Sequence, residues 1–375
     1  MNHEATFSQF TADLRQFISD SIQRTEDLSA RNDRFNRLAL RLFALQFAAN
    51  LSFRRFCEAA NRLPDSIGSW RDIPAVPAFA FKDGLMTCLE ESKRERVFCS
   101  SGTTGTRASR HYHSSDSLKA YESSLWPWFK AHLLPECGDA GNPPALVILA
   151  PRVADAPNSS LAHMFEHIRE QLGSPADVFM SSVSTNGSWV VPFERTISAL
   201  EKHTKAATPV LLLGTAFSFV HFLDDLKRHR GHVQLPAGSR LMETGGYKGR
   251  SRSMAKAELH ALLSEMLGLD PAMIVSEYGM SELSSQAYNG VAGAPRREPF
   301  QFPPWARAQV ISPETGLEPA EGNAGLIHVL DLANVYSVMH LQTEDIGRRR
   351  ANGFELIGRA AAAEPRGCSL LQEPE

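Results

Sequence analysis

Hydrophobic residues recur at helical spacing from residue 7 to about residue 63, as in RFNRLALRLFALQFAANL (34–51). Residues three or four positions apart share one face of a helix, and no glycine or proline interrupts the pattern before Pro64. We expect two or three helices, and therefore a helical N-terminal region over residues 1–70. The proline-bearing stretch RDIPAVPAFAFKDG (71–84) cannot continue a helix, which indicates an extended connector.

A different pattern follows, in which short aliphatic runs alternate with amphipathic stretches. The aliphatic runs are typical of strands buried on both faces, and they are ALVILAP (145–151), PVLLLGT (209–215), AMIVSEYG (272–279) and GLIHVLDL (325–332). The stretches with helical periodicity are 160–172, 195–203 and 253–268, the last ending at Gly268. This alternation predicts an α/β core, and we treat residues 71–375 as one α/β domain.

Composition narrows the possible partners. The chain has 375 residues, 43% hydrophobic and 22% charged, with a net charge of −3 and no cluster of Lys and Arg. Such a balance favours a globular protein and argues against nucleic acid or an anionic membrane as the main partner. No apolar run approaches the roughly 18 residues needed to span a bilayer, and the first residues lack the pattern of a signal peptide. We therefore expect a cytoplasmic location.

The five cysteines are widely spaced and form no C-x-x-C pair. This spacing supports neither a disulfide framework nor a structural zinc site. Cys368 differs from the others because it lies in RGCSLL, seven residues before the C-terminus.

One polar stretch, SSGTTGTRAS (Ser100–Ser109), directly follows the hydrophobic Val97, Phe98 and Cys99. Glycines allow the backbone to approach a ligand closely, and adjacent amides and hydroxyls can surround an anion. The stretch is therefore a candidate phosphate-binding loop, although it matches neither a Walker A motif nor G-x-G-x-x-G. A plain surface loop is the alternative.

Further motifs follow this loop in a fixed order, namely METGGYKG (242–249), EYGMSELSSQAY (277–288), LQTEDIGR (341–348) and ELIGR (355–359). Together with SSGTTG they resemble the adenylate-forming superfamily of acyl-CoA synthetases, luciferases and peptide-synthetase adenylation domains. Within it the chain is most similar to the acyl-protein synthetases of bacterial luminescence, near the phenylacetate-CoA ligases. DIPAVPAFAFK (72–82), NSSLAHM (158–164) and the final RGCSL carry that closer resemblance.

The resemblance implies the fold of an adenylate-forming large lobe, with the C-terminal lobe missing or vestigial. The sequence departs from the superfamily pattern at two places. Thr106-Arg107-Ala108 stands where a lysine usually follows the loop, and Glu344 replaces a glycine in the Thr-Gly-Asp motif.

The resemblance also implies that ATP and Mg²⁺ take part and that the substrate is a carboxylic acid of the fatty-acid class. It implies a nucleotide site formed by Ser101, Gly102, Thr103, Thr104, Gly105, Gly245, Gly246, Tyr278, Gly279, Ser281, Asp345 and Arg359. The loop residues would hold the β- and γ-phosphates, Ser281 the α-phosphate, and Asp345 with Arg359 the ribose. Glu282 would bind Mg²⁺, a hard cation that prefers oxygen ligands.

In the acyl-protein synthetases a C-terminal cysteine accepts the acyl group as a thioester, which implies that Cys368 is the catalytic nucleophile. Arg366 could help to lower the pKa of its thiol. The acyl group would then pass to a partner such as an NADPH-dependent acyl reductase. An external thiol, of coenzyme A or a carrier protein, is the alternative acceptor. The identity and chain length of the acid, and the oligomeric state, do not follow from the sequence.

Two other interpretations remain open. His163, Glu166 and His167 form an H-x-x-E-H pattern, which would indicate a metallopeptidase. The two departures from the superfamily pattern would suit a degenerate fold that serves as a scaffold.

We expect His111 and His113 to contact solvent or substrate rather than a metal. Aromatic residues of GTAFSFVHFLDDL (214–226) could line an acyl tunnel, but their spacing favours ordinary core.

Overall fold

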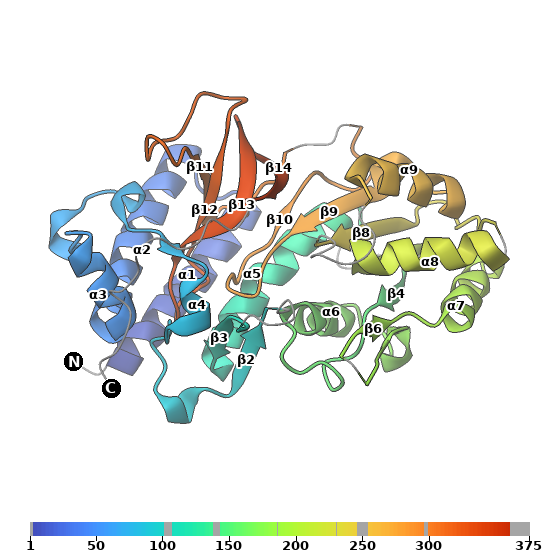
Figure 1. Cartoon of the computed structure of the whole chain (residues 1–375), viewed down its shortest axis with the longest axis horizontal. Coiled ribbons are helices and arrows are strands. Elements are labelled where there is room, and N and C mark those ends of the chain that lie inside the picture. The colour runs from blue at the N-terminus through green and yellow to red at the C-terminus, as the bar shows by residue number, and fades with distance from the viewer. Residues whose placement is uncertain are drawn as a thin grey trace. The chain divides into compact units, whose positions relative to one another are not determined.

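The computed structural model describes residues 3–100, 107–137, 143–185, 187–229, 231–245, 254–295 and 299–360 (Figure 1). Ser101, Gly102, Thr103, Thr104, Gly105, Gly246 and Cys368 therefore lie outside the described residues. The chain divides into two compact units. Unit 1 comprises residues 1–125, 280–285 and 299–375, and unit 2 comprises residues 126–279 and 286–298.

Unit 1 begins with three helices, α1 (His3–Gln23), α2 (Leu28–Ala49) and α3 (Leu51–Ala59), which confirms the helices expected there. Asp27 caps α2 by accepting a hydrogen bond from the backbone N–H of Ala30 at 2.8 Å. Asn50 ends α2 and begins α3, where its side chain accepts from the backbone N–H of Phe53. These helices belong to the same compact unit as residues 71–125, so the predicted domain boundary at residue 70 stays a prediction.

Unit 1 also contains an antiparallel sheet and a hairpin. The sheet order is β1-β13-β12-β11, with β14 paired to β13 and β1 parallel to β13. Its strands are β1 (Val76–Pro77), β11 (Ala306–Ile311), β12 (Ala324–Asp331), β13 (His340–Arg350) and β14 (Gly353–Arg359). The hairpin consists of β2 (Arg96–Cys99) and β3 (Arg110–His113).

Two expectations about these segments need correction. The run at 325–332 forms a strand, but β12 belongs to the antiparallel sheet and its burial alternates at first, so it is not buried on both faces throughout. The connector at 71–84 is not wholly extended, because it ends in the short helix α4 (Ala80–Asp83). In α4, Ala80 and Phe81 bury their side chains, and this packing favours a helical turn after Pro77.

Unit 2 contains a five-stranded sheet of order β10-β9-β8-β7-β4. The strands β4 (Ala145–Leu149), β7 (Val210–Thr215), β8 (Arg240–Thr244) and β9 (Ile274–Tyr278) are parallel, and β10 (Ala287–Tyr288) pairs antiparallel with β9. Three of these strands were expected from their aliphatic runs. The sequence analysis did not identify β8, because RLMET is short and carries charged residues.

Three helices of unit 2 confirm the expected amphipathic segments, namely α6 (Ser160–Gln171), α7 (Phe193–Lys205) and α9 (Lys256–Leu267). The sequence analysis did not name two further helices, α8 (Ala216–His229) and α5 (Ser115–Leu133), the second of which runs from unit 1 into unit 2. Gly268 ends α9 with φ 63°, a left-handed conformation that suits glycine. The remaining short elements are β5 (Ser182–Val183), β6 (Trp189–Val190), η1 (Pro64–Ser66), η2 (Trp70–Asp72), η3 (Glu91–Lys93), η4 (Ala176–Val178) and η5 (Pro271–Met273).

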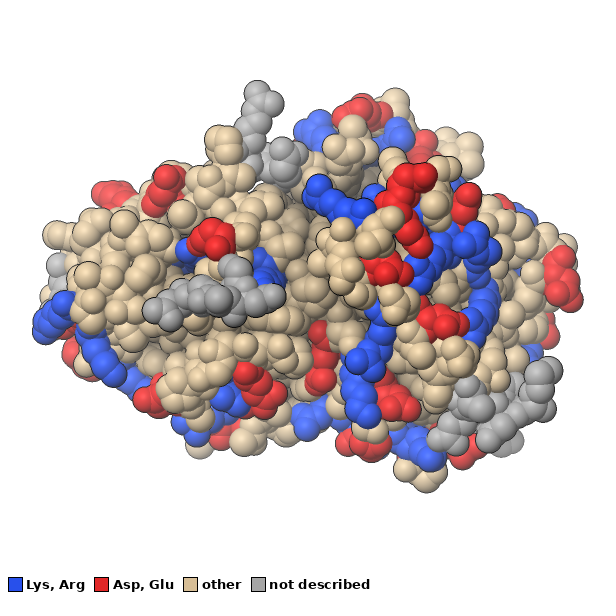
Figure 2. All heavy atoms as spheres, turned by 180° about the vertical axis from the view of Figure 1, so that it is seen from behind, with Lys and Arg blue, Asp and Glu red and all other residues tan. Residues whose placement is uncertain are grey.

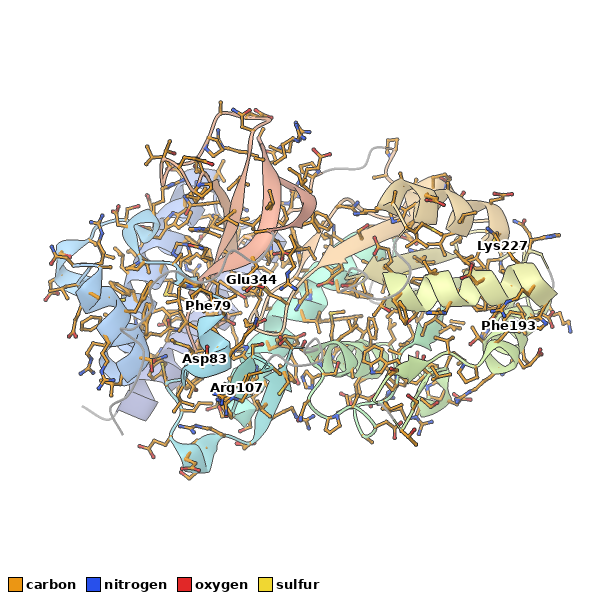
Figure 3. All side chains as sticks on the ribbon, viewed as in Figure 1. Phe79, Asp83, Arg107, Phe193, Lys227 and Glu344 are labelled. Carbon is orange, nitrogen blue, oxygen red and sulfur yellow. The ribbon has the colours of Figure 1, made fainter. Side chains whose placement is uncertain are left out.

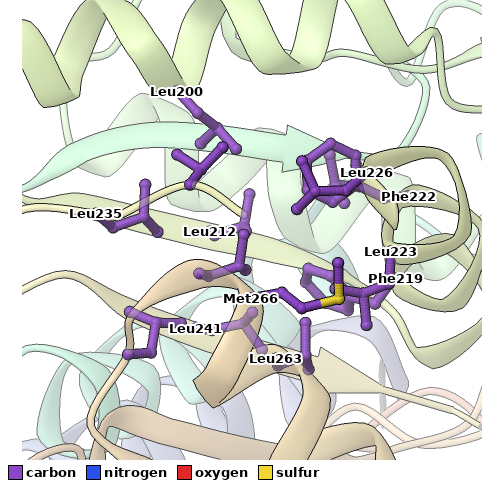
Figure 4. Close-up of a cluster of buried hydrophobic side chains, with 14 of the residues drawn as sticks. Leu200, Leu212, Phe219, Phe222, Leu223, Leu226, Leu235, Leu241, Leu263 and Met266 are labelled. Carbon is purple, nitrogen blue, oxygen red and sulfur yellow. The ribbon is translucent and has the colours of Figure 1, made fainter. Parts of the chain in front are cut away.

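The core of unit 2 lies between its sheet and helices α7, α8 and α9 (Figure 4). Leu212 and Leu241 from the strands pack in one cluster with Phe219 and Phe222 from α8 and Leu263 from α9. Burying one such side chain stabilises the fold by roughly 1.5–3 kcal/mol. Phe219 and Phe222 are thus ordinary core, as their spacing favoured, and this core fixes the strand ends described below.

Within the described parts of the chain, no helix combines the length and hydrophobicity needed to cross a bilayer. On the face drawn in Figure 2, basic and acidic side chains are interspersed rather than segregated by sign.

Candidate nucleotide site

In unit 2 the METGG and EYG motifs lie at the carboxyl ends of neighbouring parallel strands. The register of β8 and β9 pairs Glu243 with Ser276 and Thr244 with Glu277. Gly245 continues from β8 with φ 74°, a conformation that favours glycine, while Tyr278 ends β9. In open α/β sheets the carboxyl ends of parallel strands are where ligands bind. The fold therefore brings together two motifs that are about thirty residues apart in the sequence.

A buried pair joins these two strand ends. The Thr244 hydroxyl donates a short hydrogen bond to the Glu277 carboxylate. Burial raises the pKa of Glu277 to about 7, against the lowering effect of the Thr244 hydrogen bond. A Cβ atom added at Gly279 would lie 2.4 Å from Glu277 Oε1, so the carboxylate occupies the space beside this glycine. Glu277 thus limits which residue can follow Tyr278.

A second buried polar group supports the same strands. Glu243 Oε1 accepts a hydrogen bond from the Ser276 hydroxyl, and it lies 3.1 Å from His260 Nε2 on α9. Lys256 Nζ, at the start of α9, is 4.0 Å from the same carboxylate oxygen. Because buried carboxylates are costly unless paired, these contacts compensate Glu243 and tie α9 to β8.

In unit 1, Ser281 and Glu282 lie in a short segment whose side chains are buried. The Ser281 hydroxyl donates to Glu282 Oε2 at 3.0 Å, and Glu282 is only 5% exposed. Among the described residues no lysine, arginine or histidine forms an ion pair with Glu282. A buried carboxylate without a cationic partner is a good ligand for a metal cation, so Glu282 fits the expected role in chemistry and burial.

The residues that follow Glu282 are held by Asp331 and Asn334. Asp331 Oδ2 accepts from the Ser284 backbone N–H at 2.9 Å, and its Oδ1 accepts from the Ser285 hydroxyl at 2.7 Å. Asn334 Nδ2 donates to the backbone oxygen of Glu282 at 2.8 Å. Since these groups are buried and their hydrogen bonds are satisfied, the segment has one well-defined conformation.

Asp345 and Arg359 are direct partners in the register of β13 and β14. Arg359 Nε lies 3.7 Å from Asp345 Oδ1, while Arg359 Nη2 lies 3.0 Å from Glu344 Oε2. Lys82 Nζ of α4 lies 3.8 Å from the other oxygen of Glu344. Glu344, which replaces the glycine of the motif, is thus the centre of a partly exposed group of two acids and two bases.

The described flanks of the candidate phosphate loop belong to the β2–β3 hairpin. The backbone N–H of Ser109 donates to the Ser100 hydroxyl at 3.0 Å, and that of Ser100 donates to Ser109 O at 3.3 Å. Arg107, just after the loop, lies 3.8 Å from Asp83 of α4 (Figure 3). Phosphate binding by residues 101–106, between these flanks, stays a prediction.

His111 and His113 are not the solvent contacts that we expected. Both side chains are buried, and burial lowers the pKa of His111 to about 4. On β3 they alternate with the partly exposed Tyr112, so both rings point to the inner side of the hairpin. The sequence analysis expected contact with solvent or substrate, but the alternation along the strand decides their burial.

The H-x-x-E-H pattern lies on α6, where Arg169 Nη2 and Nε both donate to Glu166 Oε1, at 2.9 and 3.1 Å. Within the described residues, no three His, Cys, Asp or Glu side chains are grouped so as to hold a metal ion. The Arg169 contact engages the glutamate that a metallopeptidase would use as a base.

Sequence reasoning missed the residues that hold the site, above all Glu277, Asp331 and His260. Each is a polar residue in or beside a hydrophobic run, and a polar side chain at a buried position needs partners. Asp331 at the end of GLIHVLDL carried that signal, but its partners, Ser284 and Ser285, could not be assigned without the fold.

Comparison with known proteins gives a consistent result. The sequence profile described as acyl-protein synthetase, LuxE, matches residues 11–373. The long-chain-fatty-acid–luciferin-component ligase of Vibrio harveyi is 23% identical, with 89% of this chain and 86% of that protein covered. The protein of the same name from Aliivibrio fischeri is 22% identical over the same shares.

Solved structures with a similar fold include 2-hydroxyisobutyryl-CoA ligase in complex with 2-HIB-AMP and CoA. That structure has a TM-score of 0.63 and 13% identity, and the match covers 90% of this chain and 68% of that one. An open conformation of the same ligase has a TM-score of 0.59 and 14% identity, over 87% and 75% of the two chains. The fold is thus that of the adenylate-forming ligases. Because the LuxE profile spans nearly the whole chain, this protein belongs to the acyl-protein synthetase family and is a ligase.

Proposed function

We propose that this chain activates a fatty acid with ATP and then takes the acyl group onto Cys368. In the first step a carboxylate oxygen attacks the α-phosphorus of ATP, the bond to the bridging oxygen breaks, and pyrophosphate leaves with that electron pair. In the second step the Cys368 thiolate attacks the acyl carbon and AMP leaves. The products are a thioester, AMP and pyrophosphate.

The observation that carries the proposal is the fixed Ser281–Glu282 segment, whose carboxylate is buried and forms no ion pair with a described cationic side chain. Displacement at phosphorus depends mainly on positioning and on neutralising charge, and both need a rigid, preorganised segment. When bound, Mg²⁺ would neutralise phosphate charge, and Glu282 would hold it. With ATP bound, the Ser281 hydroxyl would turn from Glu282 and donate to the α-phosphate instead, while Ser101, Thr103 and Thr104 would bind the outer phosphates.

The nucleoside contacts follow the same logic. A carboxylate accepts hydrogen bonds from two adjacent hydroxyls, so Asp345 would bind the ribose, with Arg359 keeping its orientation through the contact at 3.7 Å. Gly245, Gly246, Tyr278 and Gly279 would border the adenine. Gly245 directly follows β8, and Tyr278 ends the neighbouring strand β9.

The second step is proposed from the position of Cys368 and from the family, because the cysteine lies outside the described residues. A thiolate is the nucleophilic form of cysteine, and a mixed anhydride is a reactive acyl donor. Both named relatives are long-chain-fatty-acid–luciferin-component ligases, which supports a long acyl chain. The thioester would then be delivered to a partner protein, and an acyl reductase is the class that we propose.

Two measurements on the purified chain test the proposal. Exchange of labelled pyrophosphate into ATP should require both a fatty acid and Mg²⁺. Labelled fatty acid with ATP should leave a hydroxylamine-sensitive label on the protein, and Cys368→Ser should lose that label while it keeps the exchange. Cys137→Ser is the control because it removes a half-buried cysteine that carries no proposed role, and it should label normally.

The possible outcomes separate the two steps. The chain could show exchange without self-labelling and form acyl-CoA when coenzyme A is added. In that case the acyl acceptor would be an external thiol and not Cys368. Label retained by Cys368→Ser would exclude this cysteine. Absence of exchange with a panel of acids of different chain length would contradict the adenylation step itself and favour a scaffold.

A further inference from the structure

A buried imidazole contacts the backbone of the candidate metal-binding segment. His111 of β3 is 2% exposed, and its Nδ1 lies 2.9 Å from the carbonyl oxygen of Ser281. A carbonyl oxygen can only accept a hydrogen bond, so Nδ1 carries the proton and donates it. This bond joins a strand of the hairpin to the residue directly before Glu282.

The surroundings of His111 keep its ring neutral and fixed. The rings of Phe81 and His113 have centroids 6.0 and 4.1 Å from that of His111. Burial lowers the pKa of His111 to about 4, so the imidazole is neutral near pH 7 and has a single N–H. The hydrogen bond to Ser281 uses that N–H.

The same hairpin flanks the candidate phosphate loop. Cys99 of β2 pairs with Arg110 of β3, next to His111, and residues 100–109 connect the two strands. The strand that leaves the loop is therefore also the strand that holds Ser281.

Two consecutive carbonyl groups of the segment are fixed by side chains. His111 donates to Ser281 O, and Asn334 Nδ2 donates to Glu282 O at 2.8 Å. Two held peptide groups define the direction of the side chains that they carry. Without His111, the Ser281 carbonyl would be buried and unsatisfied, and rotation of that peptide would relieve the cost.

We propose that His111 is a positioning residue for adenylation, which holds Ser281 and Glu282 in register with the hairpin that carries the phosphate loop. The inference rests on the proposed function, because it assigns His111 a role through the groups that would bind phosphate and Mg²⁺. His111 itself contacts neither the substrate nor the metal.

The test compares His111→Asn with His111→Phe. The amide nitrogen of asparagine occupies nearly the place of Nδ1 and can donate to Ser281 O, whereas phenylalanine keeps the ring but has no donor. The assay is fatty-acid-dependent pyrophosphate exchange, with the KM for MgATP and the half-saturating Mg²⁺ concentration as readouts. Because a lost buried hydrogen bond costs about 1–2 kcal/mol, His111→Phe should raise both values roughly tenfold. His111→Asn should stay within about threefold of the wild type.

His113→Phe is the matched control. His113 lies two residues further along the same face of β3, but its Nδ1 is 3.1 Å from the Ser117 hydroxyl in α5. This variant should lower the melting temperature and leave both readouts of the assay unchanged. If His111→Phe does not fold, His111→Gln replaces it, since its amide nitrogen lies near the Nε2 position and cannot reach Ser281 O.

The results distinguish the two proposals. One result would overturn the positioning role alone. In it the wild type is active, while His111→Phe, or His111→Gln in its place, loses thermal stability but keeps the KM for MgATP and the Mg²⁺ dependence. Equal losses in the asparagine and phenylalanine variants also overturn it, because the donor would then be irrelevant. A folded wild type with no fatty-acid-dependent exchange overturns the proposed function and this role with it.

Discussion

Thr244 and Glu277 are joined side chain to side chain across the carboxyl ends of β8 and β9, within the core of unit 2. The carboxyl group of Glu277 is buried, and its pKa is raised to about 7 from the ordinary 4.5. Between these two values the folded chain holds a proton that the unfolded chain has lost. Glu277 therefore contributes stability that is fully present below pH 4.5 and is lost as the pH rises through 7.

Glu277→Gln should remove this pH dependence. The amide keeps an acceptor for Thr244 but cannot ionise, so the variant should gain stability relative to the wild type as the pH rises from 5 to 8. We expect a gain on the order of 1–3 kcal/mol in the free energy of unfolding, measured by urea denaturation at both pH values. Buried histidines such as His340 have lowered pKa values and act in the opposite direction, but they cancel in the difference between variant and wild type. A constant difference across the range would contradict the buried, raised pKa.

Gly279→Ala should disturb the same pair by contact. The added Cβ would lie 2.4 Å from Glu277 Oε1, so the carboxyl group must move and strain its hydrogen bond with Thr244. Overpacking of this kind costs typically 1–3 kcal/mol, which thermal denaturation would measure. Gly68→Ala is the control, because a Cβ there would meet no atom within 4 Å. The double variant Gly279→Ala with Glu277→Ala should recover part of the loss, and no recovery would show that Glu277 is not the obstacle.

Asp331→Asn should loosen the segment that contains Glu282. Asp331 accepts three hydrogen bonds, from the Ser284 and Ala333 backbone N–H groups and from the Ser285 hydroxyl. Asparagine would turn an N–H₂ group toward at least one of these donors, at a cost of about 1–3 kcal/mol. Urea denaturation should show this loss, whereas Asp65→Asn at an exposed position should change stability by less than about 0.5 kcal/mol. Equal stability of the two variants would mean that the buried network is not needed.

Much of the fold could be predicted from the periodicity of hydrophobic residues. This works where the same face of a strand or helix is buried along its whole length, because the sequence pattern then matches the burial. The runs at 145–151, 209–215 and 272–279 form β4, β7 and β9, and the helical spacing at the N-terminus forms α1–α3. β8 escaped detection because its buried Arg240 and Glu243 are compensated by tertiary contacts. Prediction from residue type alone treats charged residues as exposed. Their burial can be recognised only when the groups that pair with them in the folded chain are known.

The candidate site divides in the same way. Motif residues such as Ser281 and Asp345 were predicted as site residues because their order along the chain resembles a superfamily, and that role stays a prediction. His111, Asp331 and Glu277 act through partners that are distant in sequence, for example 170 positions between His111 and Ser281. Such pairings are set by strand register and helix packing, which a single sequence does not display.

Glu344 offers a test of how a departure from the motif affects the nucleotide site. Its carboxylate holds Arg359 at 3.0 Å and Lys82 at 3.8 Å, and all three side chains are partly exposed. Glu344→Gln should therefore change the free energy of unfolding by less than about 1 kcal/mol. Released from Glu344, Arg359 can pair more closely with Asp345, which would compete with the ribose for that carboxylate. We expect the KM for ATP to rise about two- to fivefold in pyrophosphate exchange, an effect that 0.5 M salt should reduce.

Glu355→Gln is the matched control for Glu344→Gln, because Glu355 pairs with Arg348 and Arg350 on the same two strands, away from Arg359. Both variants remove one exposed carboxylate from β13 or β14, so a general effect of charge on ATP binding would appear in both. An effect limited to Glu344→Gln would assign it to the contact with Arg359. If instead the two variants raise the KM for ATP equally, or if neither does, the contact between Glu344 and Arg359 has no influence on nucleotide binding, and the glycine of the motif is replaced here without consequence for the site.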